Sequence, residues 1–217
     1  MTKVIIFDFD GTIADTLPAI VMITNRLAPQ FGYQTTTPEV LSRLKNLSPQ
    51  EIIKSSGISW LKLPFLLKKV TKELAKEISN LSPIFGMKSA LIELKKQGHI
   101  LGIVTSNSTQ NVNDFIRVNF EHNIFDYICA GIAVFRKNKT INQLINKHNF
   151  SHQDVIYVGD ETRDIEAARK SKIKIISVSW GFNSSEILAT KKPDFLINDP
   201  QELITIINQL SLQPQLT

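Results

Sequence analysis

The sequence predicts an α/β fold: a doubly wound parallel sheet with helices on both faces, and an all-helical segment inserted near the N-terminus. Apolar runs of four to seven residues alternate with helical patterns from residue 83 onward, which is typical of parallel strands covered on both faces. The stretch 16–81 has helical spacing and no convincing strand. Polar residues directly follow several apolar runs, and ligands of such sheets bind at those strand ends.

The first expected strand, residues 4–7, is apolar and stops at a carboxylate. Because side chains alternate along a strand, we expect Asp8 and Asp10 on one side and Phe9 on the other. Two neighbouring carboxylates repel each other and need a cation or a shared proton. Gly11 allows a sharp turn that brings backbone N–H groups close to a ligand. The stretch indicates a metal and phosphate site, and the alternative is a strand followed by an acidic loop.

Residues 16–81 are expected to form the helical segment, which leaves residues 1–15 and 82–217 for the core. Pro29 and Gly32 are expected to end its first helix. Ser48 and Glu51 have capping-box spacing at the start of a later helix. The longest helix is expected over residues 63–79, with an apolar stripe of Leu67, Val70, Leu74 and Ile78.

The second part of the chain predicts strands and helices in alternation. Strands are expected at residues 100–104, 128–134, 155–158, 173–178 and 195–197. Helices are expected at residues 86–97 and 108–119, from Lys139 or Thr140 to His148, at 162–170, near Ser185, and after Asp199 and Pro200. The polar tail from residue 211 to 217 is expected to fray.

Composition restricts the class of protein. The chain has 217 residues, of which 42% are apolar, so it can bury a sizeable core. No apolar run approaches the roughly eighteen residues of a membrane span, and no secretory signal precedes the first strand. A single cysteine, Cys129, excludes an internal disulfide, so we expect a cytoplasmic protein. The net charge of +5 is spread along the chain, which suits a small anionic substrate and argues against nucleic-acid binding.

The polar groups at the strand ends together meet the needs of phosphate-ester hydrolysis. An Asp carboxylate can attack phosphorus, and a second can protonate the leaving oxygen and then deprotonate water. Oxygen-only ligands of high charge favour Mg²⁺. A hydroxyl and backbone N–H groups can hold the phosphoryl oxygens, while a lysine supplies positive charge. Candidates for these roles are Asp8, Asp10, Gly11, Thr105, Ser106, Asn107, Lys137, Asp160 and Asp164.

These residues resemble the four motifs of the haloacid dehalogenase-like (HAD) superfamily, in the family's order. The motifs are Asp8-x-Asp10-Gly-Thr12, Thr105 at a strand end, a lysine near Lys137, and Gly159-Asp160-x-x-x-Asp164. The resemblance covers the whole chain and is closest to the phosphoglycolate phosphatase-like branch. It implies a Rossmann-like core with a helical cap that closes over the site and selects the substrate.

The resemblance also implies a role for each residue. Asp8 would be the nucleophile and Asp10 the general acid and base. Mg²⁺ would be bound by Asp8, by the backbone carbonyl of Asp10 and by Asp160, with Asp164 supporting the waters of the metal. Thr105 would bind phosphate with help from Ser106 and Asn107. The substrate would be a small phosphorylated metabolite.

Several points stay open from the sequence. The third motif lacks its usual glycine, so Lys139 is an alternative to Lys137. Where the family often has a glycine after the helix of the fourth motif, this chain has Ser171-Lys172, which would cost stability in a left-handed turn. Asp164 is nearly as well explained as an acid at a helix start, and Glu161 is expected to be exposed.

Two alternatives to a phosphatase remain. A phosphomutase or phosphotransferase acting on a sugar phosphate shares all four motifs. A phosphate-ligand sensor without catalysis is less consistent with the sequence, because a binder has no use for Asp10. The sequence identifies neither the phosphate ester nor the oligomeric state.

Overall fold

The chain folds around a parallel six-stranded sheet. The computed structural model describes residues 1–59, 61–121, 123–133 and 136–212. In these residues the strands lie in the order β3-β2-β1-β4-β5-β6, and every neighbouring pair is parallel. The strands are β1 (Val4–Phe7), β2 (Ile100–Val104), β3 (Tyr127–Cys129), β4 (Val155–Gly159), β5 (Lys174–Val178) and β6 (Phe195–Ile197). The expected α/β class with a doubly wound sheet is confirmed.

Strand β1 lies at the centre of the sheet, between β2 and β4. Phe7 is in register with Ile103 on one side and with Val158 on the other. The residues that follow these three strands therefore emerge at the same edge. The winding reverses between β1 and β4, because β2 and β3 extend the sheet one way and β4 to β6 extend it the other way. This reversal is where sheets of this kind bind ligands.

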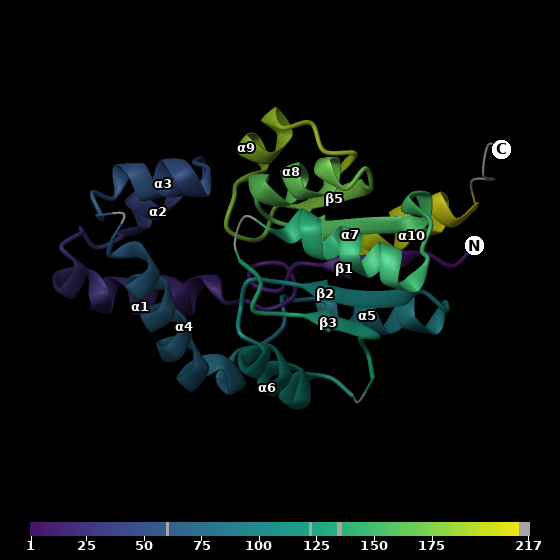
Figure 1. The fold of residues 1–217 in the computed structure, drawn as a ribbon, viewed down its shortest axis with the longest axis horizontal. Helices are drawn as coiled ribbons and strands as arrows, with labels where there is room; N and C mark the ends of the chain where they lie inside the picture. The colour runs from purple at the N-terminus through teal and green to yellow at the C-terminus, as the bar shows by residue number, and fades with distance from the viewer. Residues whose placement is uncertain (60, 122, 134–135, 213–217) are drawn as a thin grey trace.

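Helices cover both faces of the sheet, as Figure 1 shows. Because side chains alternate along a strand, Ile5 and Phe7 of β1 enter one core cluster while Val4 and Ile6 enter another. The first cluster includes residues of α5 (Met87–Lys96), α6 (Thr109–Asn119) and α10 (Gln201–Leu212). The second includes residues of α7 (Lys137–His148), α8 (Thr162–Lys170) and α9 (Ser185–Thr190), and the 3₁₀ turn η2 (His152–Asp154) precedes β4.

Residues 16–81, here called the helical insert, contain only helices among their described elements. These are α1 (Leu17–Phe31), α2 (Pro38–Leu44), α3 (Pro49–Ser55), α4 (Leu63–Glu77) and the 3₁₀ turn η1 (Ile78–Asn80). The insert lies beyond the carboxyl end of β1, at the left of Figure 1. Its two connections to the core bond to each other, since Asp15 N donates to Ser82 O at 3.1 Å and Ile84 N donates to Ile13 O at 2.9 Å.

The expectations for the insert hold except at two residues. Pro29 lies inside α1 and does not end it; the helix closes at Gly32, as expected, where a left-handed backbone (φ 77°) lets the N–H bond back to Ala28. In the expected apolar stripe Leu74 and Ile78 are buried and Val70 packs against the core, but Leu67 is 47% exposed. The expected capping box of Ser48 and Glu51 is present at the start of α3.

The second part of the chain departs from expectation in two places. Strand β3 ends at Cys129, because the following chain bends toward β2: Gly131 N donates to Asn107 O at 2.6 Å and Ile132 N donates to Thr105 O at 3.3 Å. The expected end of this strand, Val134, lies outside the described residues. Helix α7 begins at Lys137, ahead of the expected start at Lys139 or Thr140. Lys172 adopts the left-handed conformation (φ 55°), at the place where the resemblance implies a glycine.

Among the described helices, none combines the length and the apolar character that crossing a membrane requires.

Candidate active site

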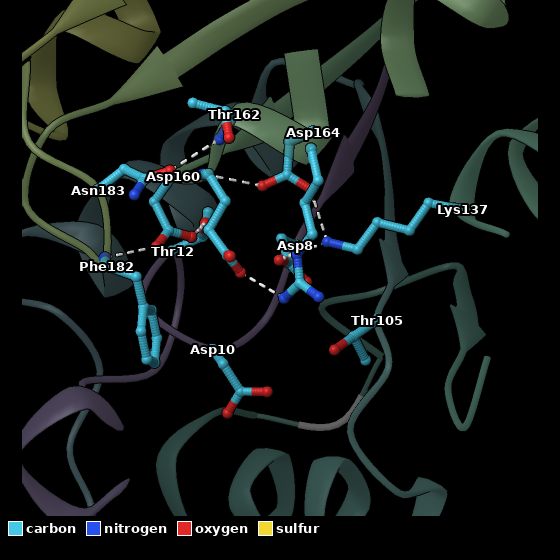
Figure 2. Close-up of polar contacts among 12 residues, drawn as sticks. Asp8, Asp10, Thr12, Thr105, Lys137, Asp160, Thr162, Asp164, Phe182 and Asn183 are labelled. Atoms are coloured by element: carbon cyan, nitrogen blue, oxygen red, sulfur yellow. Dashed lines mark hydrogen bonds and ion pairs between the residues drawn. The ribbon is translucent and has the colours of Figure 1, made fainter. Parts of the chain in front are cut away.

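The site is built around Asp8, which directly follows the central strand and is 2% exposed. Its backbone N–H donates to Val158 O at 2.8 Å, so β4 holds the residue in place. Its Oδ1 accepts from Phe9 N at 2.8 Å, and its Oδ2 accepts from Lys137 Nζ at 2.5 Å. Figure 2 shows the Lys137 side chain extending from the right of the view toward Asp8.

Lys137 is the first residue of α7, and its ammonium group lies between two carboxylates. It donates to Asp8 Oδ2 and, at 2.6 Å, to Asp164 Oδ1. Burial disfavours its charge, but Asp164 and Asp8 outweigh that effect and raise the pKa of Lys137 well above its ordinary value. The residue is therefore a fixed buried cation. Lys139, the alternative left open by the sequence, is exposed.

Asp160 follows β4 and is fully buried. Thr12 Oγ1 donates to its Oδ1 at 2.6 Å, and Phe182 N donates to its Oδ2 at 2.7 Å. Glycines make room for it: a Cβ on Gly11 would lie 2.5 Å from Asp160 Oδ2, and one on Gly181 would lie 2.1 Å from the same atom. The N–H of Gly11, predicted to face phosphate, donates to Ala14 O at 2.9 Å. In this structure Gly11 provides space for Asp160.

Asp164 lies in the first turn of α8 and is fully buried. Its Oδ2 accepts from Glu161 N at 3.0 Å, which completes a capping box at the start of the helix. Asp164 is thus both a helix-capping acid and a member of the acidic cluster. The expectation that Glu161 is exposed is wrong: it is 8% exposed and forms an ion pair with Arg163.

Asp8, Asp160 and Asp164 together can hold a metal ion. One carboxylate oxygen from each lies within 4.8 Å of the others, and all three residues are buried. Burial, followed by repulsion from Glu161, Asp8 and Asp164, raises the pKa of Asp160 well above its ordinary value. Burial also outweighs the attraction of Lys137 and raises the pKa of Asp164 to about 6. A cation would relieve both costs.

The charges near the cluster fit a divalent ion. The four carboxyl groups of Asp8, Asp160, Asp164 and Glu161 outnumber the two cations Lys137 and Arg163 by two, and a divalent ion would balance them in their deprotonated form. The donor atoms of the cluster are carboxylate oxygens, which hard cations such as Mg²⁺ prefer. The residues present therefore fit the metal that the sequence predicted.

Asp10 does not join the cluster through its side chain. Figure 2 shows its carboxylate turned away from Asp8, Asp160 and Asp164. Asn107 Nδ2 donates to Asp10 Oδ1 at 2.9 Å and to its Oδ2 at 3.1 Å. Burial of the carboxyl group, and then the charge of Asp8, raise the pKa of Asp10 to about 7. An acid with such a pKa can both give and take a proton near neutral pH.

The three polar residues after β2 have different surroundings. Thr105 is 1% exposed, and its Oγ1 accepts from Asn107 N at 3.1 Å, which leaves the hydroxyl hydrogen for another acceptor. Ser106 is half-buried. Asn107 is 5% exposed and directs its side-chain amide toward Asp10.

Asn183 was not singled out from the sequence, yet it joins the site to the helical insert. Its Oδ1 accepts from Thr162 N at 2.9 Å, beside Asp160. Its Nδ2 donates to Lys45 O at 3.2 Å and to Leu47 O at 2.9 Å, both in the insert. The only local signal is its position in the bend of residues 179–183, which follows β5.

Comparisons with known proteins agree with this site. The model of the haloacid dehalogenase-like hydrolase family matches residues 5–178. A phosphoglycolate phosphatase from Synechococcus elongatus is 35% identical over 211 residues, covering 97% of this chain and 100% of the relative. A second phosphoglycolate phosphatase, from Vibrio cholerae, is 26% identical over 220 residues and covers 94% of this chain and 96% of its own.

A solved structure supports the same fold. A predicted phosphatase from Clostridium acetobutylicum superposes with a TM-score of 0.81 at 22% identity, covering 96% of this chain and 99% of that one. The family match and the curated relatives lead to one conclusion. The chain belongs to the haloacid dehalogenase-like hydrolases, in the phosphoglycolate phosphatase-like branch, and it is an enzyme of the phosphatase class.

Proposed function

We propose that the enzyme is a Mg²⁺-dependent phosphomonoesterase that works through an aspartyl-phosphate on Asp8. The observation that carries the proposal is the buried Asp8–Asp160–Asp164 cluster with Lys137 bonded to the nucleophile. Mg²⁺ would be held by Asp8, Asp160 and the backbone carbonyl of Asp10, with Asp164 beside them, and it would supply charge that offsets the phosphoryl oxygens.

The residues of the chain divide the reaction into two steps. In the first, an Asp8 oxygen attacks phosphorus, the ester P–O bond breaks, and Asp10 gives its proton to the leaving oxygen. In the second, water attacks phosphorus, Asp10 takes its proton, and the bond between phosphorus and Asp8 breaks. Lys137 keeps the Asp8 carboxylate oriented throughout by donating to its Oδ2, and the Thr105 hydroxyl donates to a phosphoryl oxygen.

The substrate class follows from the relatives and from the position of the insert. We propose a small phosphorylated metabolite of the phosphoglycolate type, because phosphoglycolate is what the named relatives act on. Residues 16–81 would act as the cap over a core of residues 1–15 and 82–217. Their position beyond the strand ends suits a lid that excludes water during phosphoryl transfer.

We also propose that the enzyme works in the cytoplasm. A single cysteine leaves no internal disulfide, which suits the reducing cytoplasm. The modest, dispersed positive charge suits a small anionic substrate better than nucleic acid.

The test is the Asp8→Asn variant with Mg²⁺ and a generic aryl phosphate. The variant keeps the shape of the side chain and removes the nucleophile, so turnover is expected to fall below detection. A thermal melt and a circular dichroism spectrum establish that the variant is folded. Undiminished hydrolysis by the folded variant would show that Asp8 is not the nucleophile.

A further inference from the structure

Asn107 lies in a buried network of side-chain amides that ends at Asp10. Its Nδ2 faces both oxygens of the Asp10 carboxylate, at 2.9 and 3.1 Å. Its Oδ1 accepts from Ser108 N at 2.8 Å and from Asn111 Nδ2 at 2.9 Å. Asn107 and Asn111 are 5% and 1% exposed.

This network fixes which way the Asn107 amide points. Two N–H donors converge on Oδ1, and an amide NH₂ in that place would leave both of them without an acceptor. The NH₂ group must therefore face Asp10. Asn111 is itself held in the first turn of α6, where its N–H donates to Ser108 Oγ at 3.2 Å. The Asn111 Nδ2 also donates to Thr71 O at 3.4 Å, so the start of α6 and helix α4 of the insert together determine the orientation of the Asn107 amide.

The direction in which Asp10 is held suits a proton donor. During attack by Asp8 the phosphoryl group lies between the nucleophile and the leaving oxygen, so the acid has to lie beyond that group. Figure 2 shows the Asp10 carboxylate turned away from Asp8, while Thr105 lies on another side of the site. Asn107 holds that carboxylate through both of its oxygens.

We propose that Asn107 is the positioning residue for the acid Asp10, and that Asn111 fixes Asn107 in turn. The sequence had assigned Asn107 to phosphate binding, but its amide hydrogens are directed at Asp10 and leave that role to Thr105. This inference rests on the proposed function, because it concerns how the acid of that reaction is held.

The test compares two esters that need the acid to different extents. A 4-nitrophenyl phosphate has a good leaving group and needs little protonation, whereas the alkyl ester phosphoglycolate depends on it. The parameter kcat/KM depends on the steps up to and including the first irreversible one, which here is departure of the leaving group. For Asn107→Ala we expect kcat/KM to fall by about 10- to 100-fold with the alkyl ester and by about 3-fold or less with the aryl ester.

Three further variants control the comparison. Asn111→Leu removes the second amide at similar volume and is expected to show a smaller loss with the same preference between esters. Thr105→Ala is expected to lower kcat/KM with both esters to the same extent and to weaken inhibition by inorganic phosphate. Gln110→Ala, at an exposed position of α6 next to Asn111, is expected to leave kcat/KM unchanged with both esters.

A crystal structure of Asn107→Ala tests the positioning role without a measurement of activity. Crystals of Asn107→Ala are expected to show the Asp10 carboxylate rotated from its wild-type direction. An unchanged carboxylate, or an equal loss with both esters together with weaker phosphate inhibition, would overturn the positioning role. If the wild-type enzyme hydrolysed neither ester, the proposed function would fail, and the crystal structure would still decide whether Asn107 positions Asp10.

Discussion

The catalytic strand ends and the helical insert are held in place by different means. Asp8, Asp160, Asp164 and Lys137 are buried, and each has at least two hydrogen-bonding partners. In the insert, helices α2 and α3 contain no buried residue. Near the site, α2 and α3 are fastened by hydrogen bonds from Asn183 and Ser184 to the loop at Lys45. The core therefore pre-organises the site, whereas α2 and α3 of the insert can shift at lower cost than α1 and α4, whose apolar residues belong to the main core cluster.

The largest effect is expected from removing the buried cation. Lys137→Met leaves Asp8 and Asp164 without their shared partner, so we expect turnover to fall by about 10²- to 10³-fold. Loss of one member of a buried ion pair should also lower the free energy of unfolding of the metal-free protein by about 3 kcal/mol. Steady-state kinetics and urea denaturation measure both. Lys139→Met is the matched control, and a comparable loss there would refute the assignment.

The next largest effect is expected from replacing glycine by alanine in the core, and the same replacement in the insert serves as the comparison. Alanine at position 181 would place its Cβ 2.1 Å from Asp160 Oδ2, whereas at position 57, in the insert, no atom of the described residues lies within 4 Å of an added Cβ. We expect Gly181→Ala to weaken Mg²⁺ binding by about 10- to 100-fold. Gly57→Ala meets only the strain of its positive φ, about 1 kcal/mol. Calorimetric titration with Mg²⁺ separates the two, and equal affinities would contradict the crowding at Asp160.

A smaller effect concerns pH, and it too is confined to the core. The pKa of Asp10 is raised to about 7 and that of Asp164 to about 6, against about 3.9 in an unfolded chain. The folded protein therefore holds these protons more tightly, and their contribution to stability is lost as the pH rises from about 4 to about 7. Because the proposed Mg²⁺ site requires Asp164 in its deprotonated form, we expect Mg²⁺ to raise the free energy of unfolding more at pH 8 than at pH 5.

Urea denaturation with Mg²⁺ or with a chelator, at both pH values, measures this difference. A metal effect of the same size at pH 5 and pH 8 would contradict the assignment of the acidic cluster to the metal.

The smallest effect is expected where the insert is fastened. Asn183→Ala removes the bonds to Lys45 O and Leu47 O and leaves Thr162 N without its acceptor. We expect a loss of about 1–3 kcal/mol in stability, a KM raised several-fold, and faster proteolysis within the insert. Asn46→Ala, at the exposed edge of the same contact, should change these quantities less. Unchanged proteolysis in Asn183→Ala would show that the insert is held by other contacts.

The sequence predicted the parts of the molecule whose signals are local. Asp8 and Asp160 follow directly after apolar strands, and parallel pairing brings such strand ends to one edge. Lys137 was preferred to Lys139 by position alone, and the structure places it against Asp8. The helices of the insert followed from their spacing and caps, except that α1 continues past Pro29 to Phe31.

Features that depend on distant partners could not be predicted. Asn183 and Leu47 are 136 residues apart, and no local pattern links them. Glu161 resembles a solvated acid at a helix start, yet Arg163 and the capping box bury it. Asn107 follows a strand end as a phosphate ligand would, and only the placement of Asn111 shows that its amide faces Asp10.

The central claim is that Asp8 carries the phosphoryl group during turnover. Borohydride reduces an acyl phosphate to the alcohol, so quenching a turning-over enzyme with it converts a phosphorylated aspartate to homoserine. Peptide mass spectrometry is expected to find homoserine at position 8 only when Mg²⁺ and substrate are both present, and none in Asp8→Asn. Homoserine at the position of a different aspartate would contradict the account. So would the absence of homoserine under conditions in which hydrolysis of the phosphoenzyme is shown to limit turnover.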